Sequence, residues 1–369
     1  MTRAVVDTPV RIAACGCLTA FGDGKNSHAA LVRGESALRL LPVLGEAGGE
    51  NAPLALRSPM NDTDPSRWVA ELAAFDGVLR DAAWGRRRTP VFVTSSNFGV
   101  DGLYAYTRTQ SPEALRRGII AHGMADLRRG YGWGDNVTVL SHACVSAQLG
   151  LMHAARVLER GEADRVLVFS YDFLSPFVAG GFHALKILNP YLPAPYAKRA
   201  SGSIGLGDGA AYAVLTRDTG DFTIRRQHCH NEMWHFTAND PTGAGFAEAL
   251  APFSPAAGAP AKVWFKGHGT GTLEPGALEC AAAQSAFPDA PVAGWKGGLG
   301  HTLGSCALVE LAIGLESFRT GVAPGTVGTT GECFSGNVAT AAFPVSGYDG
   351  AVMACNAFGG AHAAMLVTA

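Results

Sequence analysis

The stretch Asn136-Val-Thr-Val-Leu-Ser-His-Ala-Cys-Val-Ser146 passes from an apolar segment into a polar turn that carries a cysteine. Its first five residues predict a strand, and a helix is expected after the turn. The apolar residues with helical spacing in that helix are Leu149, Met152, Ala155 and Leu158. Gly161 suits the C-terminal end of the helix. The stretch therefore predicts a strand–turn–helix unit with Cys144 in its turn.

The same alternation of strands and helices continues on both sides of this unit. Further strands are expected at residues 10–14, 90–94, 165–170, 262–266 and 351–355. Further helices are expected at residues 26–33, 112–129 and about 306–318. Such alternation is typical of an α/β fold whose sheets are covered on both faces.

A break in the pattern near Arg217-Asp-Thr-Gly-Asp221 indicates two architecturally similar halves. We expect a first half at residues 1–218, with the cysteine nucleophile, and a second at 219–369, with polar loops that carry His, Lys and His. A length of 369 residues agrees with two or three structural units, at about 150 residues each.

The composition excludes several classes of protein. Hydrophobic residues make up 47% and charged residues 16%, which provides for a large core and excludes a disordered or fibrous chain. A net charge of −2 gives no reason to expect nucleic acid or a membrane surface as partner. No apolar run reaches the roughly 18 residues needed to cross a bilayer. We therefore expect a cytoplasmic protein.

Eight cysteines are scattered through the chain, so reduced thiols are expected rather than a disulfide framework. Cys144 precedes a helix, whose N-terminal N–H groups and dipole are expected to lower the pKa of its thiol. Such a thiolate forms thioesters readily. A free cysteine is otherwise commonly a small buried hydrophobe, and we assign six of them to the core: Cys15, Cys17, Cys280, Cys306, Cys333 and Cys355.

Three polar junctions follow predicted strands or precede predicted helices in the second half. His268-Gly-Thr-Gly-Thr272 offers hydroxyls and close backbone approach to an extended polar ligand arm. Lys296-Gly-Gly-Leu-Gly-His301 places a lysine and a histidine at one junction. In Asn356-Ala-Phe-Gly-Gly360 the amide of Phe358 could donate a hydrogen bond to an oxyanion.

Taken in order, these motifs resemble those of the β-ketoacyl synthases, or ketosynthases, of the thiolase superfamily, in particular the type II fatty-acid and polyketide kind. The stretch Trp234 to Pro241 is similar to another of the family's segments, and the resemblance runs from Val10 to the end of the chain. It implies a five-layer αβαβα fold of two similar halves, each with a mixed sheet.

The resemblance also implies roles for matching residues. Cys144 would accept an acyl group, and His268 and His301 would assist decarboxylation of a malonyl thioester. Lys296 would hold the His301 region and tune its electrostatics. The backbone N–H groups of Cys144 and Phe358 would form the oxyanion hole, and Phe358 would also be a gate. The remaining implied roles are pantetheine contact for Thr270 and Thr272, and support for Glu279, Gly359 and Gly360.

This chemistry implies an acyltransferase that needs no metal and no cofactor of its own, since phosphopantetheine arrives on the carrier protein. The implied partners are an acyl carrier protein, acyl and malonyl thioesters, and a second subunit in a homodimer or a heterodimer with a chain-length factor. Gly276 stands where the family has Asp, and Asn356 where many members have an aromatic residue. The region 101–135 is also short, which points to a specialised polyketide or polyene pathway.

Three alternatives compete with this hypothesis. A chain-length-factor-like subunit would keep the fold without the chemistry, but such subunits typically lack the cysteine. Acyl transfer without decarboxylation would need only one base, whereas two histidines are present. A metal protein could use Gln227-His-Cys-His230 or Cys15-Gly-Cys17, yet no second ligand pair lies at a zinc-like spacing.

Overall fold

A computed structural model describes residues 4–45, 49–60, 66–235, 237–260 and 262–369. Its main feature is a mixed sheet of 12 strands. One end of the sheet contains β2 (Val10–Thr19), β10 (Gly209–Thr216), β8 (Arg165–Asp172), β6 (Val91–Thr94) and β7 (Val137–Leu140). The other end contains β11 (Phe222–Asn231), β17 (Ala361–Thr368), β16 (Gly350–Ala357), β12 (Val263–Lys266) and β13 (Val292–Ala293).

These two sets of strands have the same order and the same directions. Outward from the centre, each set runs first, fifth, fourth, second and third in chain order. The first two pairings in each set are antiparallel and the last two are parallel. The central strands β2 and β11 pair antiparallel, with Ile12 opposite Phe222, and so join the halves. The repeated order accounts for the similarity between the halves that the sequence indicates.

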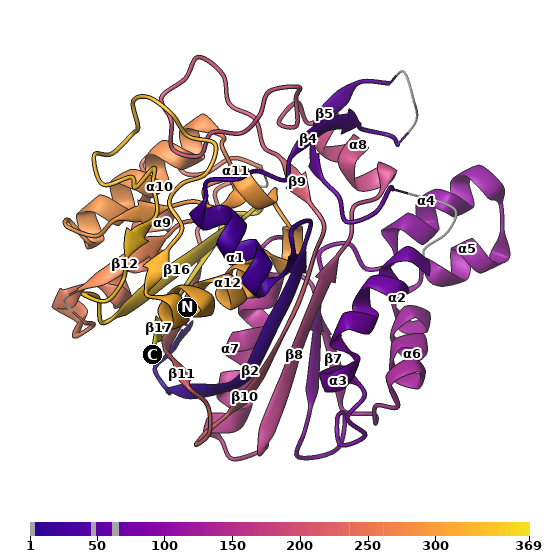
Figure 1. Ribbon diagram of the computed structural model, residues 1–369. Coiled ribbons are helices and arrows are strands. Elements are labelled where there is room, and N and C mark those ends of the chain that lie inside the picture. The colour runs from indigo at the N-terminus through magenta and orange to yellow at the C-terminus, as the bar shows by residue number, and fades with distance from the viewer. Residues whose placement is uncertain (1–3, 46–48, 61–65, 236, 261) are drawn as a thin grey trace.

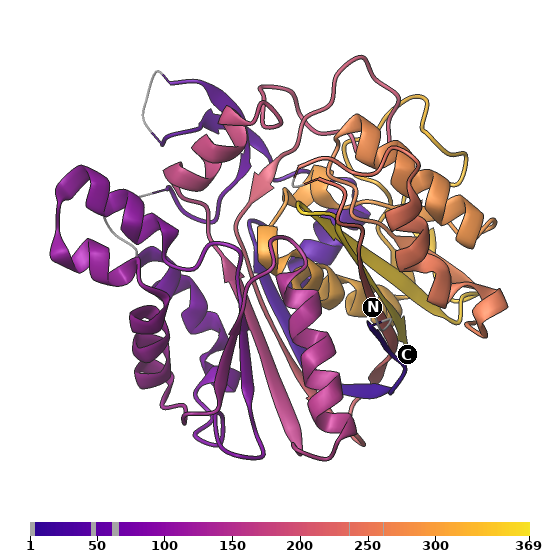
Figure 2. The same cartoon turned by 180° about the vertical axis from the view of Figure 1, so that it is seen from behind.

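Helices cover both faces of each half, and Figures 1 and 2 show the two halves side by side. The helices α7 (Ser146–Glu159) and α12 (Cys306–Thr320) lie in the middle, where they contact each other and strands of the sheet. The outer helices of the first half include α2 (Ser66–Leu72), α3 (Asp76–Leu79) and α6 (Ile120–Tyr131). Those of the second half are α9 (Ala244–Leu250) and α10 (Leu273–Ala286).

The burial of the strands explains these layers. In β8, Val166 and Val168 face the central core while Leu167 faces the outer helices, because successive side chains of a strand point to opposite faces. In β16, Met353 and Val352 divide in the same way between the central and outer cores. Since α12 is buried on nearly all sides, it behaves as a core helix between two sheet faces.

The remaining elements are short or peripheral. They are β1 (Ala4–Val6), β3 (Gly22–Asp23), α1 (Gly24–Val32), β4 (Arg39–Pro42), β5 (Asn51–Ala55), α4 (Val100–Thr109), α5 (Pro112–Arg117), α8 (Pro176–Ala184), β9 (Leu206–Gly207), α11 (Lys296–Leu299), β14 (Val322–Ala323) and β15 (Phe343–Pro344). Short 3₁₀ turns occupy residues 73–75, 251–253, 255–257 and 303–305. No helix of the described ranges combines the length and apolar character that a bilayer crossing requires.

The predicted α/β fold with a thiolase-like layered arrangement of two similar halves is confirmed. Each strand and helix expected from the sequence is present, with β2 and β16 longer than expected. The proposed boundary at 218/219 lies in the turn between β10 and β11, and the division into domains there stays a prediction.

Candidate active site

Cys144 lies in a tight turn between the end of β7 and the start of α7. Ala143, just before it, has a φ of 45°, which is uncommon for a residue with a side chain. The Ser146 hydroxyl stabilises the turn: it accepts a hydrogen bond from the N–H of His142 at 2.8 Å and donates one to the carbonyl of Ala143 at 2.6 Å. The strained residue is thus Ala143, directly before the cysteine, and such strain is often found at functional sites.

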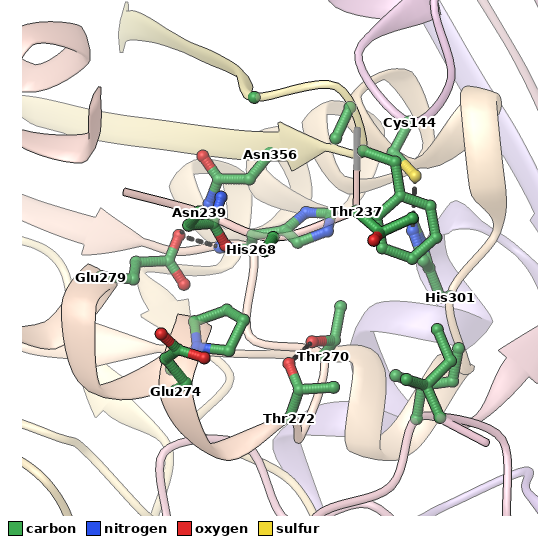
Figure 3. A pocket seen from close by; sticks show the side chains of 18 of the residues that line it. Cys144, Thr237, Asn239, His268, Thr270, Thr272, Glu274, Glu279, His301 and Asn356 are labelled. Carbon is green, nitrogen blue, oxygen red and sulfur yellow. Dashed lines mark hydrogen bonds between the residues drawn. The ribbon is translucent and has the colours of Figure 1, made fainter. Parts of the chain in front are cut away.

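The three side chains on which the sequence hypothesis depends meet in one pocket. The Cys144 Sγ lies 3.0 Å from Nε2 of His301. The rings of His301 and His268 have centroids 4.9 Å apart and are perpendicular. Figure 3 shows Cys144 and His301 beside each other, with His268 on the same side of the cavity. The structure therefore brings a sulfur and two imidazoles from separate loops into contact range.

The hydrogen bonds of His301 define its tautomer. The backbone N–H of Leu303 donates to Nδ1 of His301 at 3.3 Å, so that nitrogen acts as an acceptor. In a neutral ring the hydrogen must then be on Nε2, the nitrogen that faces Cys144. His301 therefore presents an N–H to the pocket. Leu303 has a φ of 55°, so this contact also depends on a strained backbone.

Burial makes the neutral forms of these groups the resting ones. Burial lowers the pKa of His268 and of His301 far below the usual value, and the nearby Lys296 lowers them further. Burial also raises the pKa of the Cys144 thiol, and the neighbouring Cys306 adds to that effect. The expected lowering of the Cys144 pKa is therefore wrong for the resting protein. Desolvation disfavours the thiolate more than the approach to α7 favours it.

Lys296 belongs to a buried ion cluster behind the pocket. Its Nζ donates to the carbonyl of His268 at 2.8 Å and lies 2.7 Å from Oε1 of Glu310. A second buried lysine, Lys266, pairs with the other oxygen of Glu310. Burial alone would lower the pKa of Lys296, but Glu310 more than compensates and keeps the ammonium charged. Lys296 thus holds the His268 loop, rather than the His301 region as expected.

Glu279 supports the same loop from the other side. Its carboxylate accepts the backbone N–H of His268 at 2.6 Å and that of Gly269 at 3.0 Å. Tyr196 and Asn356 donate to it as well, at 2.7 and 2.9 Å. These four bonds fix the loop although Gly276 stands where related sequences have Asp.

The pocket has a volume of about 270 Å³. Thr270 and Thr272 line it and hydrogen-bond to each other at 2.9 Å. Phe358 is 39% exposed and stacks on Phe182, with centroids 6.1 Å apart. Figure 3 shows the two threonines opposite Cys144 across the cavity. Gly359 and Gly360 continue this wall, and both have positive φ values.

Several site residues escaped the sequence analysis. Thr237 and Asn239 line the pocket from the segment 234–241, in which residue 236 lies outside the described residues. Ser146, Glu310 and Lys266 were also missed. Two signals could have found them. One is a polar residue on the first turn of α7, and the other is a pair of charged residues within otherwise buried elements.

All eight cysteines, which lie within the described ranges, are free thiols. The core assignment holds for the fully buried ones: Cys17, Cys280, Cys306 and Cys355. Cys15 is only partly buried against the central core. Cys333 is in a partly exposed loop, paired with Ala197, so its assignment to the core is wrong. Among described residues, no group of three or more His, Cys, Asp or Glu could hold a metal ion.

Comparisons with known proteins agree with this geometry. Residues 224–330 match the family model for the C-terminal domain of β-ketoacyl synthases. The tetracenomycin polyketide synthase ketoacyl synthase alpha subunit of Streptomyces glaucescens is 28% identical over 52% of this chain and 49% of its own length. A putative polyketide β-ketoacyl synthase of Streptomyces cyaneus is 25% identical over 71% of this chain and 67% of its own. The chain thus spans about half the length of the first of these relatives.

Solved structures show the same fold. A chain of the complex between the ketosynthase ApeO and its chain length factor ApeC from Xenorhabdus doucetiae has a TM-score of 0.82 at 21% identity, with 98% of both chains covered. A β-ketoacyl synthase from Burkholderia phymatum has a TM-score of 0.79 at 21% identity, over 98% of this chain and 99% of that one. Together with the matching motifs, these findings show a chain with the fold of solved ketosynthases, similar to β-ketoacyl synthases and matched over residues 224–330 by the model of their C-terminal domain.

Proposed function

We propose that this protein is a β-ketoacyl-(acyl-carrier-protein) synthase that joins an acyl group on Cys144 to a malonyl thioester by decarboxylative Claisen condensation. The observation that supports this best is the 3.0 Å approach of Cys144 Sγ to His301 Nε2, with His268 beside it. Residues 1–218 would supply the nucleophile and residues 219–369 the histidine and lysine loops.

The first half-reaction transfers the acyl group. Cys144 sulfur attacks the carbonyl carbon of the incoming thioester, the old carbon–sulfur bond breaks, and the thiol proton leaves with the departing pantetheine thiol. The backbone N–H groups of Cys144 and Phe358 stabilise the tetrahedral oxyanion. Lys296 favours the transient thiolate, since its charge acts to lower the pKa of Cys144.

The second half-reaction forms the new carbon–carbon bond. The malonyl carboxylate leaves as carbon dioxide, and the electrons of the broken bond move to the thioester oxygen. The N–H of His301, together with His268, stabilises that oxygen as neutral donors, a state favoured by the low pKa values of both rings. The resulting carbon nucleophile attacks the acyl-Cys144 thioester, and a solvent proton restores the thiol.

The proposal extends to partners. An acyl carrier protein would deliver phosphopantetheine past Thr270 and Thr272, so the enzyme would need no cofactor or metal of its own. Two of the similar structures are ketosynthases with a chain length factor, and a related second subunit is proposed here as well, in a cytoplasmic polyketide or polyene pathway.

Acylation is tested by mass spectrometry after incubation with acyl-carrier protein. The adduct should appear on the peptide that contains Cys144 and be lost in Cys144→Ala. Cys306→Ala is a matched control, because Cys306 Sγ lies 3.3 Å from the Cys144 carbonyl yet Cys306 is not among the residues that line the pocket. Release of carbon dioxide from malonyl-carrier protein then separates condensation from plain acyl transfer. An adduct that persists in Cys144→Ala would overturn the proposal.

A further inference from the structure

A continuous chain of partly buried hydrogen bonds links the His268 loop, through Glu279, to the segment that contains the pocket residue Asn239. Asn356, which donates to Glu279, also faces His362: its Oδ1 lies 2.9 Å from Nδ1 of that ring. The other ring nitrogen, Nε2, lies 3.1 Å from Oε2 of Glu232. Oε1 of Glu232 accepts the N–H of Asp240 at 3.0 Å, next to the pocket residue Asn239.

The donors and acceptors in this chain determine how many protons it holds. Glu279 accepts from two backbone N–H groups, so the amide nitrogen of Asn356 must face it and the amide oxygen must face His362. Nδ1 of His362 therefore has to donate. Nε2 faces a carboxylate, which also accepts. A neutral imidazole beside an ionised Glu232 has one hydrogen for these two bonds, and both bonds together need two.

Two glycines leave room for the pair. A Cβ built on Gly245 of α9 would lie 2.1 Å from Oε2 of Glu232 and 2.8 Å from the ring of His362. A Cβ on Gly360 would lie 2.6 Å from Cγ of Glu232. The backbone N–H of Glu232 also donates to the carbonyl of Gly360 at 2.9 Å. The backbone at Gly245 and Gly360 therefore leaves space for the side chains of Glu232 and His362. This space is a physical reason for the supporting role expected of Gly360.

The surroundings of His362 act in both directions on its charge. The ring is fully buried and packs on Phe246 with centroids 4.3 Å apart. On balance the pKa of His362 is lowered: burial has the largest effect and His230 adds to it, whereas Glu232 and Glu279 act to raise the pKa. His268 is near enough for its own pKa to respond to His362. A full charge isolated on the ring is therefore disfavoured, and a proton shared with Glu232 leaves the pair neutral overall.

We propose that His362 is a positioning residue whose Nδ1–H holds Asn356 in place, and that the Glu232–His362 pair retains a second, shared proton which keeps the chain of hydrogen bonds intact. When rising pH removes this proton, one of the two bonds becomes a contact between acceptors. Asn356 then loses its anchor, and the Glu279 clamp on the His268 loop loosens. This effect on catalysis rests on the proposed function, whereas the proton count does not.

The Glu232→Gln variant removes the need for the shared proton while keeping the geometry of the hydrogen bonds. A glutamine at 232 can accept from Asp240 with its oxygen and donate to Nε2 of His362 with its nitrogen, so a neutral ring then satisfies every bond. Ring-nitrogen NMR of ¹⁵N-histidine-labelled protein reports this directly, with His362→Phe to assign the signal. We expect Nδ1 to carry hydrogen, and the His362 signals to titrate with pH in the natural protein but not in Glu232→Gln. The proton assignment is overturned if Nδ1 of His362 carries no hydrogen, or if the His362 signals titrate in the same way in both proteins.

Kinetics test the positioning role. Release of carbon dioxide from malonyl-carrier protein should fall as the pH rises through the transition seen by NMR, and this fall should be absent in Glu232→Gln. Below this transition His362→Phe should lower the rate about tenfold, the loss expected when one buried hydrogen bond no longer holds the loop. Above the transition the natural protein has lost the same anchor, so the two rates should converge. His230→Phe is the control, since His230 lies opposite His362 on the neighbouring strand but outside the chain of bonds. It should keep the pH-dependent fall in rate, with the midpoint moved toward higher pH because His230 acts to lower the pKa of His362.

The outcomes distinguish the two proposals. If NMR gives the expected protons and no carbon dioxide is released by the natural protein, the proposed function fails and the proton count stands. If carbon dioxide is released and His362→Phe is as fast as the natural protein, the positioning role is overturned.

Discussion

The two halves of the molecule place different chemistry at equivalent positions. The third strand of each half, β7 or β13, leads into a turn that faces the pocket: one carries Cys144, the other Lys296 and His301. The second strands, β6 and β12, are followed by loops that a buried carboxylate holds in each case. Asp172 holds residues 95–97 and Glu279 holds His268 and Gly269.

The two loops differ in what the carboxylate that holds each of them supports. The Glu279 clamp leaves the His268 ring in the pocket with Cys144. The Asp172 clamp takes up its own polar loop: it accepts from Ser95 Oγ at 2.7 Å and from Asn97 Nδ2 at 3.0 Å. Those residues line a separate cavity of about 140 Å³ that contains no cysteine or histidine. Similar scaffolding therefore supports the proposed catalytic pocket in one half and a separate cavity in the other.

The largest expected effect compares the two third-strand junctions. His301→Ala should lower malonyl decarboxylation by about 10²–10³-fold, the usual cost of removing an oxyanion donor. Self-acylation of Cys144 should fall much less, because the sulfur and its oxyanion hole remain. Carbon dioxide release and the mass of the Cys144 peptide measure the two steps separately. Equal losses in both would argue against the division of roles between the halves.

The second-strand loops give the next effect. Glu279→Gln weakens two charge-assisted bonds to backbone N–H groups, at about 1.5–3 kcal/mol each, and should slow decarboxylation about 100-fold or more. Asp172→Asn should slow it less than tenfold, since Asp172 mainly holds residues 95–97, outside the pocket, and reaches the His301 loop only through the backbone N–H of Gly304. The measurement is the rate of carbon dioxide release for both variants. Thermal unfolding of both checks that the fold is intact. A slower Asp172→Asn than Glu279→Gln would contradict the comparison.

The sequence supports the fold more completely than the site. Strand–turn–helix units were predictable at β7–α7 and before α12, because apolar periodicity and polar turns mark them. The strand β10 (Gly209–Thr216) was not, since it is apolar on both faces and lacks alternation. Cys144, His268 and His301 were identifiable from their motifs. The Lys266–Glu310 pair and the Asn356–His362–Glu232 chain were not, because residues far apart in sequence meet only in the folded core.

The pH dependence of protein stability gives a further test of Asp172, the carboxylate that holds the loop of the first half. Burial raises the pKa of Asp172 to about 6, although Ser95 and Asn97 act to lower it. An unfolded aspartate titrates near its ordinary value, so the folded state binds the extra proton between the two pKa values. Asp172 therefore adds stability as the pH falls through about 6 and loses it as the pH rises.

Asp172→Asn removes this titration. Denaturant unfolding of both proteins across acid and neutral pH should show that the free energy of unfolding of the natural protein rises relative to that of the variant. The rise should be about 1.4 kcal/mol per pH unit as the pH falls from about 6 toward the pKa of the free side chain. A constant difference at all pH values would show that folding leaves the pKa of Asp172 unchanged.

The smallest effect contrasts two helical glycines of the second half. Gly276→Ala in α10 should stabilise the protein by about 0.5–1 kcal/mol, because alanine favours helix and the new Cβ would meet only Phe334 and Tyr196 at 3.7 Å or more. Gly245→Ala in α9 gains the same helix preference, but its Cβ collides with Glu232 and His362. Denaturant midpoints should therefore rise for Gly276→Ala and fall for Gly245→Ala. If both midpoints rise, Glu232 and His362 move aside at little cost in free energy. The space that this pair needs is then not the reason for a glycine at position 245.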